Sequence, residues 1–384
     1  MSNAMTPGLQ EALAALRAGR AAEAEQRLQR LVASGPAAAT TWLALAFARV
    51  NLERPEDALA AVDQALALEP RNIRALLFKA DHLDRMGQHR VALGFYQATL
   101  RVAAGMSQVP ADVARGMERA QDVCDRWAAR YEDYLLENLE AAGFTRREQP
   151  RFAESLDIAC GKVPVQLQQP TRYYFPALPQ RAFYERSEFS WAAGLEAHTD
   201  AIREELLGLM SEPEQFEPYL ESDSNRPRLN SSRNFDSMDW SASYLWREGA
   251  LVEEVASRCP RTLAALAAVP LCIIPGQMPS VLFSSLAPGA RIEPHHGAVN
   301  SRLICHLPLL VPQNCGELRV GNDSRPWREG ELLVFDDSVE HEAWNRSNET
   351  RVVLLFDIWR PELTADERHW VSTMLQAVKA FQSS

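Results

Sequence analysis

Four of the chain's eight histidines lie within residues 295–341, where their spacing could support metal chemistry. His295 stands in the run 293–297 (Glu-Pro-His-His-Gly), and His341 stands in the acidic run 336–342, which follows an expected strand. Neutral imidazole is the commonest protein ligand for iron, zinc and copper, and two strands of a barrel can bring such rings together. The cluster therefore makes a metal site the first hypothesis.

Two adjacent carboxylates, Asp336 and Asp337, precede His341 and are the nearest candidates for general acid–base chemistry. Neighbouring residues of a strand point to opposite faces, so these two side chains are not expected to share one site. We interpret them as turn and structural groups.

The histidines must be positioned by short strands, because the sequence beyond residue 270 alternates β-rich runs with Gly, Pro and Asn turns. This pattern is typical of an antiparallel sandwich or barrel. The run 352–356 is apolar on both faces, so we expect it between two neighbouring strands. We expect a helix over 189–207 and further helices outside the sheets from the segment 190–270. The expected strands are 271–274, 281–286, 303–311, 317–320, 331–335 and 351–359.

The N-terminal third repeats itself with a period of 34 residues. Ala24 aligns with Ala58 and Ala92, and small residues at these places let two helices approach closely. Prolines at equivalent places, Pro36 and Pro70, are expected to open the helices that follow them. The pattern resembles the tetratricopeptide repeat over roughly residues 8–104. Such a region could be a spacer, an oligomerisation arm or a groove for a peptide or protein partner.

The chain is therefore expected to be an α+β protein of two domains. Residues 5–145 form a helical repeat domain, in which a helix over about 109–143 caps the array, and residues 146–384 form the β-rich domain. The boundary is placed at the polar stretch that follows Gly143. Residues 2–4 are interpreted as a cloning remnant.

Composition excludes several classes of protein. The chain has 384 residues and a formal net charge of -11, which argues against nucleic-acid binding because phosphate neutralisation needs a basic surface. Its six cysteines form no Cys-x-x-Cys pair, which argues against a zinc knuckle and against a disulfide framework. We find no run of about 18 apolar residues and no signal peptide, so we expect a cytoplasmic protein without a transmembrane segment. The oligomeric state stays open.

Two long signatures in the C-terminal half carry a family resemblance. They are the runs 295–307 and 327–344, and the second continues through Arg351 to 357–363. They resemble the aspartyl/asparaginyl β-hydroxylases, which are iron(II)- and 2-oxoglutarate-dependent dioxygenases. The resemblance covers about residues 165–365 and implies a double-stranded β-helix, a jelly-roll or cupin-like fold. Tetratricopeptide-like helices also precede this domain in members of that family.

The resemblance implies that His295 and His341 are the two metal ligands. Many relatives in the wider superfamily add a carboxylate two residues after the first histidine. Gly297 stands at that position and has no side chain. This agrees with the β-hydroxylases, which use two histidines and leave the third face of the metal to water. Glu293 is the alternative third ligand, and a solvated loop carboxylate is the plainer interpretation of that residue.

The resemblance also implies a site for 2-oxoglutarate, which reacts with O2 at the iron. Arg351 corresponds to the arginine that grips the distal carboxylate, a role that suits a planar and always charged guanidinium. Ser284 corresponds to a hydroxyl partner of the same carboxylate, and His306 to a donor near the other end. Arg302 is expected to add positive potential at the mouth, or else to form a structural ion pair.

Two departures from the family pattern concern the substrate. Ile304 replaces a second arginine that helps the peptide hydroxylases to hold an acidic side chain, and Leu282 replaces a basic residue. The expected function is hydroxylation of an unactivated C–H bond, first of all the β-carbon of an aspartyl or asparaginyl residue or a related amino acid. Hydroxylation of a lipid acyl chain is the alternative within the family. A zinc or other cupin-type metalloenzyme and a non-catalytic repeat adaptor with a degenerate barrel are the rival interpretations.

Overall fold

The chain folds into two compact units in a computed structural model that describes residues 6–222 and 234–382. The units are Met1–Cys160 and Gly161–Ser384. The predicted domain ends at residues 5 and 384, and the proposed cloning remnant at 2–4, lie outside the described residues. Within those residues, no helix is both long enough and apolar enough to cross a membrane.

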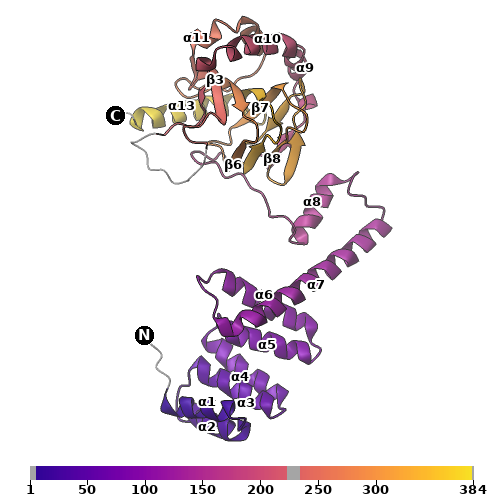
Figure 1. Ribbon diagram of the computed structural model, residues 1–384, viewed down its shortest axis with the longest axis vertical. Coiled ribbons are helices and arrows are strands. Elements are labelled where there is room, and N and C mark those ends of the chain that lie inside the picture. Colours follow the sequence, from indigo (N-terminus) through magenta and orange to yellow (C-terminus); the bar gives the residue numbers. More distant parts are fainter. Residues whose placement is uncertain (1–5, 223–233, 383–384) are drawn as a thin grey trace. The chain divides into compact units, whose positions relative to one another are not determined.

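Six helices of the first unit form three consecutive antiparallel pairs (Figure 1). Helices α2, α4 and α6 begin at residues 21, 55 and 89, so successive starts are 34 residues apart, as predicted. The aligned Ala24, Ala58 and Ala92 are each 0% exposed, because their small side chains lie where neighbouring helices meet. The helices are α1 (Pro7–Arg17), α2 (Ala21–Ala33), α3 (Ala39–Asn51), α4 (Pro55–Leu68), α5 (Ile73–Arg85) and α6 (His89–Ala104).

The repeat prolines occupy a different place from the one predicted. Pro36 and Pro70 lie in connecting turns, three residues before α3 and α5 begin at residues 39 and 73. In the second case Asn72 is the helix cap, and its side chain accepts a hydrogen bond from the N–H of Ala75. A proline before the cap restricts the turn and does not form the first turn of the helix.

The first unit ends later than predicted. The expected capping helix is α7 (Ala111–Ala141), and it is followed by α8 (Pro150–Ala159). Arg146 bonds Asp157 of α8 at 2.9 Å and lies 3.9 Å from Glu132 of α7. These ion pairs connect α8 to α7 of the first unit. The boundary therefore falls after Cys160 and not after residue 145.

Within the described residues, the strands of the second unit form two antiparallel sheets. The larger has the order β1-β10-β7-β12-β5-β3-β2, with β4 beside β3, and the smaller has the order β6-β11-β8-β9. The larger sheet comprises β1 (Phe183–Tyr184), β2 (Glu217–Pro218), β3 (Trp240–Arg247), β4 (Ala250–Leu251), β5 (Val281–Leu286), β7 (Arg302–Leu310), β10 (Leu333–Phe335) and β12 (Arg351–Trp359). The smaller comprises β6 (Arg291–His295), β8 (Glu317–Val320), β9 (Asp323–Pro326) and β11 (His341–Trp344). The predicted α+β class is correct.

Three of the predicted strands have the predicted bounds. The strands predicted over 281–286, 317–320 and 351–359 have those bounds in the structure, and β12 lies between β5 and β7, as expected. The strand predicted over 271–274 is wrong: these residues make only isolated bridges to Ile358 and Met278, because Pro270 and Pro275 interrupt the run.

The segment 190–270 contains helices, as predicted, but also the strand β3. Its sequence, Trp-Ser-Ala-Ser-Tyr-Leu-Trp-Arg, mixes small and aromatic residues and lacks the short aliphatic run between turn residues that indicates the other strands. The single helix predicted over 189–207 is divided in two at residues 197–198. The helices of this unit are α9 (Ala192–Glu196), α10 (Thr199–Met210), α11 (Glu253–Ala256), α12 (Pro260–Leu266) and α13 (Ala365–Gln382).

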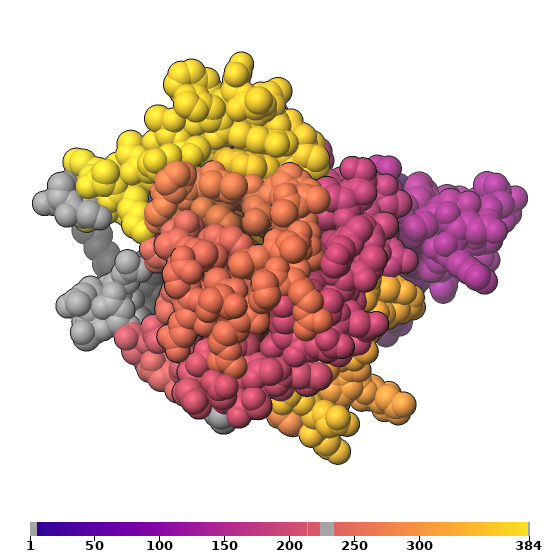
Figure 2. Space-filling model, turned by 90° about the horizontal axis from the view of Figure 1, so that it is seen from above, coloured from indigo at the N-terminus to yellow at the C-terminus, as the bar shows by residue number. Residues whose placement is uncertain are grey.

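The two faces of the larger sheet differ in polarity. Alternate residues of β12 from Val352 to Ile358 pack with α10 in one apolar cluster, which covers the outer face. The other alternate set begins at Arg351 and faces the smaller sheet. At the edge of this unit, α13 packs Val371 and Leu375 against Cys272 (Figure 2, yellow beside orange).

A buried ion pair ties the strand ends to the loop before β1. Arg360 bonds Asp336 at 2.7 Å with both side chains 0% exposed, and it also donates to Pro179 O and Tyr184 Oη. We predict that Arg360→Leu lowers the free energy of unfolding by about 3–5 kcal/mol, because it leaves a buried carboxylate without its cation. Urea unfolding followed by near-ultraviolet circular dichroism measures this loss.

The matched control is Arg328→Leu, since Arg328 forms an exposed pair with Glu331 at 3.7 Å. That variant should change the free energy of unfolding by less than about 1 kcal/mol. Equal effects of the two substitutions would contradict the structural role of Arg360.

Candidate active site

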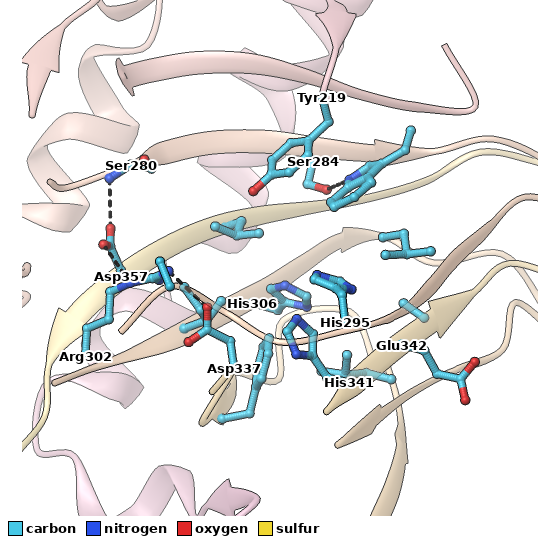
Figure 3. A pocket seen from close by; sticks show the side chains of 18 of the residues that line it. Tyr219, Ser280, Ser284, His295, Arg302, His306, Asp337, His341, Glu342 and Asp357 are labelled. Carbon is cyan, nitrogen blue, oxygen red and sulfur yellow. Dashed lines mark hydrogen bonds and ion pairs between the residues drawn. The ribbon is translucent and has the colours of Figure 1, made fainter. Parts of the chain in front are cut away.

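A cavity of about 240 Å³ lies between the inner faces of the two sheets (Figure 3). The larger sheet contributes side chains at alternate positions of its strands, because the side-chain period of a strand is two. The smaller sheet contributes both candidate metal ligands. The main polar residues that line the cavity are Ser284, His295, Arg302, His306, Asp337, His341, Arg351 and Asp357.

His295 and His341 face each other across two paired strands. His341 of β11 lies directly opposite His295 of β6, and their ring centres are 4.1 Å apart. Each Nδ1 lies near a main-chain carbonyl oxygen, that of Glu293 at 2.8 Å and that of Val339 at 3.1 Å. A carbonyl only accepts, so each Nδ1 carries the proton and each Nε2 has a free lone pair.

Burial keeps both rings neutral. It lowers the pKa of His295, and it lowers the pKa of His341 well below the usual value, with His295 adding to the effect. Two neutral imidazoles with free Nε2 lone pairs are the donor set that a divalent transition metal requires, so these residues fit an iron ion. Among the described residues, no group of three or more His, Cys, Asp or Glu side chains could hold a metal, so Glu293 does not complete a triad.

Arg351 is a buried cation whose partners leave it able to bind an anion. It is 1% exposed, its Nε has no hydrogen-bond partner among the described residues, and its terminal nitrogen donates to Ser284 O at 3.4 Å. Burial lowers the pKa of Arg351 to about 10, so the side chain is still charged at neutral pH. A charged guanidinium with an unpaired N–H in a cavity fits the carboxylate of a small dianion.

Ser284 and His306, both predicted cosubstrate residues, also line the cavity and are held by tryptophans. The indole of Trp240 donates to Ser284 Oγ at 3.2 Å, and that of Trp327 donates to His306 Nδ1 at 3.3 Å. Burial lowers the pKa of His306 well below the usual value, and the nearby Arg351 lowers it further. Both residues are therefore neutral hydrogen-bond groups inside the cavity.

Arg302 lines the cavity but forms the structural ion pair that was the alternative for this residue. It bonds Asp337 at 2.9 Å and lies 3.7 Å from Asp357. Burial raises the pKa of Asp337 to about 6, although Arg302 opposes this effect. One cation is thus shared between two buried carboxylates and is not free to grip a cosubstrate.

Gly297 is required by close packing. A Cβ atom there would overlap the carboxylate of Asp337, and the glycine N–H donates to the Asp337 carbonyl at 2.6 Å. The interpretation of Asp336 and Asp337 as structural groups agrees with their ion pairs to Arg360 and Arg302.

Sequence reasoning missed several residues of the site. Asp357 follows Arg351 at an even spacing on the strand that was predicted, so strand periodicity could have placed it in the cavity. Trp240 lies on β3, which was predicted to be helical, and Tyr219 stacks on it with ring centres 3.9 Å apart. Glu342 also borders the cavity, but it pairs with Arg291 and Arg319 and points away from the histidines (Figure 3).

Comparison with known proteins identifies the β-rich unit. Residues 196–361 match the family described as aspartyl/asparaginyl beta-hydroxylase. The human aspartyl/asparaginyl beta-hydroxylase is 32% identical over 177 residues, which cover 45% of this chain and 22% of that protein.

The ornithine lipid ester-linked acyl 2-hydroxylase of Rhizobium tropici is 32% identical over 180 residues, which cover 46% of this chain and 60% of that protein. Human aspartate beta-hydroxylase domain-containing protein 2 is 30% identical over 227 residues, which cover 58% of this chain and 57% of that protein.

The chain thus spans less than two thirds of the length of each of these relatives. Among solved structures it is similar to the TPR domain of Sgt2 from Aspergillus fumigatus, at 18% identity over 32% of this chain and 82% of that one, with a TM-score of 0.28. The spacing of the helix starts, and not this likeness, identifies the repeat.

The family match includes the strands that carry His295, His341 and Arg351. Residues 196–361 of the C-terminal unit are therefore similar to the aspartyl/asparaginyl beta-hydroxylases.

Proposed function

We propose that the chain is an iron(II)- and 2-oxoglutarate-dependent hydroxylase. The observation that carries this proposal is the pair of opposed imidazoles, His295 and His341, whose free Nε2 atoms share one cavity with the unpaired guanidinium of Arg351. A metal that is held by two neutral rings keeps open positions for other ligands. The similarity of residues 196–361 to a hydroxylase family supports the same reaction class.

When bound, iron(II) with 2-oxoglutarate and O2 would supply the oxidation of an unactivated C–H bond, which protein side chains cannot perform. His295 and His341 would hold the metal. Arg351 and Ser284 would bind one carboxylate of the cosubstrate. His306 would donate a hydrogen bond near the other end of the cosubstrate. Leu318, Leu355 and Phe335 line the same cavity and exclude bulk water, which strengthens each of these polar contacts.

The substrate proposal has two candidates within this reaction. The first is the β-carbon of an aspartyl, asparaginyl or related amino acid, after the name of the family. The second is a lipid acyl chain, the group for which the Rhizobium tropici relative is named. The ion pairs of Arg302 favour the lipid acyl chain. The guanidinium of Arg302 is already shared by Asp337 and Asp357, so it is not free to pair with an acidic side chain of a substrate.

We predict that His341→Ala abolishes stoichiometric iron(II) binding, since one remaining imidazole cannot hold the ion in this cavity. Metal content after anaerobic loading and desalting measures the loss, and succinate release should fall to background. His369→Ala, on the distant helix α13, is the control and should bind iron as the native chain does. A variant at residue 341 that retains full iron content would refute the assigned role, and a native chain that holds zinc and releases no succinate would support the rival metalloenzyme.

Arg351→Lys keeps the positive charge but loses the guanidinium, which can donate two hydrogen bonds to one carboxylate. We expect the dissociation constant for 2-oxoglutarate to rise about tenfold or more while iron binding is unchanged. Anaerobic calorimetry measures both quantities, with iron(II) titrated into the metal-free protein and 2-oxoglutarate titrated into the iron-loaded protein. Arg328→Lys changes an exposed arginine in the same way and should leave both constants as they are; an equal loss in the two variants would refute a specific role for Arg351.

Substrate-stimulated succinate release distinguishes the two substrate candidates. We predict stimulation by an acyl lipid and little stimulation by an aspartyl peptide. Among the described residues that line the pocket, the buried cation of Arg302 is already shared by two carboxylates, and Arg351 is assigned to the cosubstrate. Mass spectrometry should then find one added oxygen atom on the acyl chain. Stimulation by the aspartyl peptide alone would contradict the preference for an acyl substrate and leave the reaction class intact.

A further inference from the structure

Trp327 lies behind the cavity and contacts two of the residues that line it. It is 4% exposed, follows directly after β9, and packs with Phe335 and Val353 between the two sheets. The Arg351 guanidinium carbon lies 4.5 Å from the centre of its ring, and its indole nitrogen lies 3.3 Å from His306 Nδ1. A single side chain therefore connects the cation and the imidazole that we assign to the cosubstrate.

The contact with His306 determines where that ring carries its proton. An indole nitrogen can only donate a hydrogen bond, so Nδ1 of His306 must accept it. A neutral imidazole with an accepting Nδ1 carries its hydrogen on Nε2. Because His306 lines the cavity, this Nε2–H is the group that it can offer to a bound carboxylate.

The contact with Arg351 restricts where the guanidinium can lie. A cation that lies over an indole ring is attracted by it and is strongly held when both groups are buried. The guanidinium carbon lies 4.5 Å from the ring centre, and the Nε–H of Arg351 has no hydrogen-bond partner among the described residues. This Nε–H is thus left for an anion.

We propose that Trp327 is a positioning residue for 2-oxoglutarate: its indole N–H holds His306 as an Nε2–H donor, and its ring orients Arg351 for the same ligand. This inference rests on the proposed function. It differs from a packing role, because packing requires the ring of Trp327 but not its N–H group.

The test compares Trp327→Phe, which keeps an aromatic ring and loses the N–H, with Trp327→Leu, which loses both. Trp246→Phe is the matched control, since Trp246 packs against the apolar cluster on the outer face of the larger sheet. Titration calorimetry on the full-length protein without oxygen gives two dissociation constants. The constant for Mn(II) comes from the metal-free protein, and the constant for 2-oxoglutarate comes from the Mn(II)-loaded protein. We expect the 2-oxoglutarate constant to rise about tenfold in Trp327→Phe and further in Trp327→Leu. Mn(II) binding should stay unchanged, and Trp246→Phe should match the native chain.

A second measurement does not depend on the folding of any tryptophan variant. Nitrogen-15 NMR of the native chain with labelled histidines reports the tautomer of His306, whose signals are assigned by their loss in His306→Gln. We expect protonated Nε2 and accepting Nδ1. A native His306 protonated at Nδ1, or a Trp327→Phe variant that binds 2-oxoglutarate within twofold of the native chain, would overturn the proposal. A native chain that binds no 2-oxoglutarate would instead refute the proposed function, and the NMR result would still test the contact.

Discussion

The register between β6 and β11 is the constraint on which the site depends. It sets His295 directly opposite His341. The carbonyls of Glu293 and Val339 hold the proton of each ring on Nδ1, which leaves each Nε2 free to bind a metal. A slip of one residue in this pairing would turn one imidazole to the other face of the sheet. The metal-binding geometry is therefore a property of backbone pairing as much as of residue type.

The inner face of the larger sheet carries charges that are compensated in pairs, with one exception. Arg302 is balanced by Asp337 and Asp357, but Arg351 has no carboxylate partner among the described residues and lies fully buried. Burial of a cation without a counter-ion costs free energy, and a bound anion would offset that cost. The apolar outer face, packed under α10, supplies the stability that lets the inner face keep this arrangement.

Much of the fold could be predicted because local sequence patterns determine it. The helical repeat follows from the 34-residue period, and the strands at 281–286 and 351–359 follow from short β-rich runs between turn residues. The strand β3 could not be predicted, since its small and aromatic residues carry no such pattern. The site residues followed from resemblance, but their partners did not. Asp337 lies 35 residues from Arg302, and Trp327 lies 21 residues from His306, so only the folded chain brings them together.

An anaerobic crystal structure of the full chain with iron(II) and 2-oxoglutarate tests the central claim most directly, because anomalous scattering locates the metal. We predict one iron bonded to Nε2 of both His295 and His341, with a cosubstrate carboxylate on the Arg351 guanidinium. Iron bound elsewhere, or bound to only one of the two imidazoles, would contradict it.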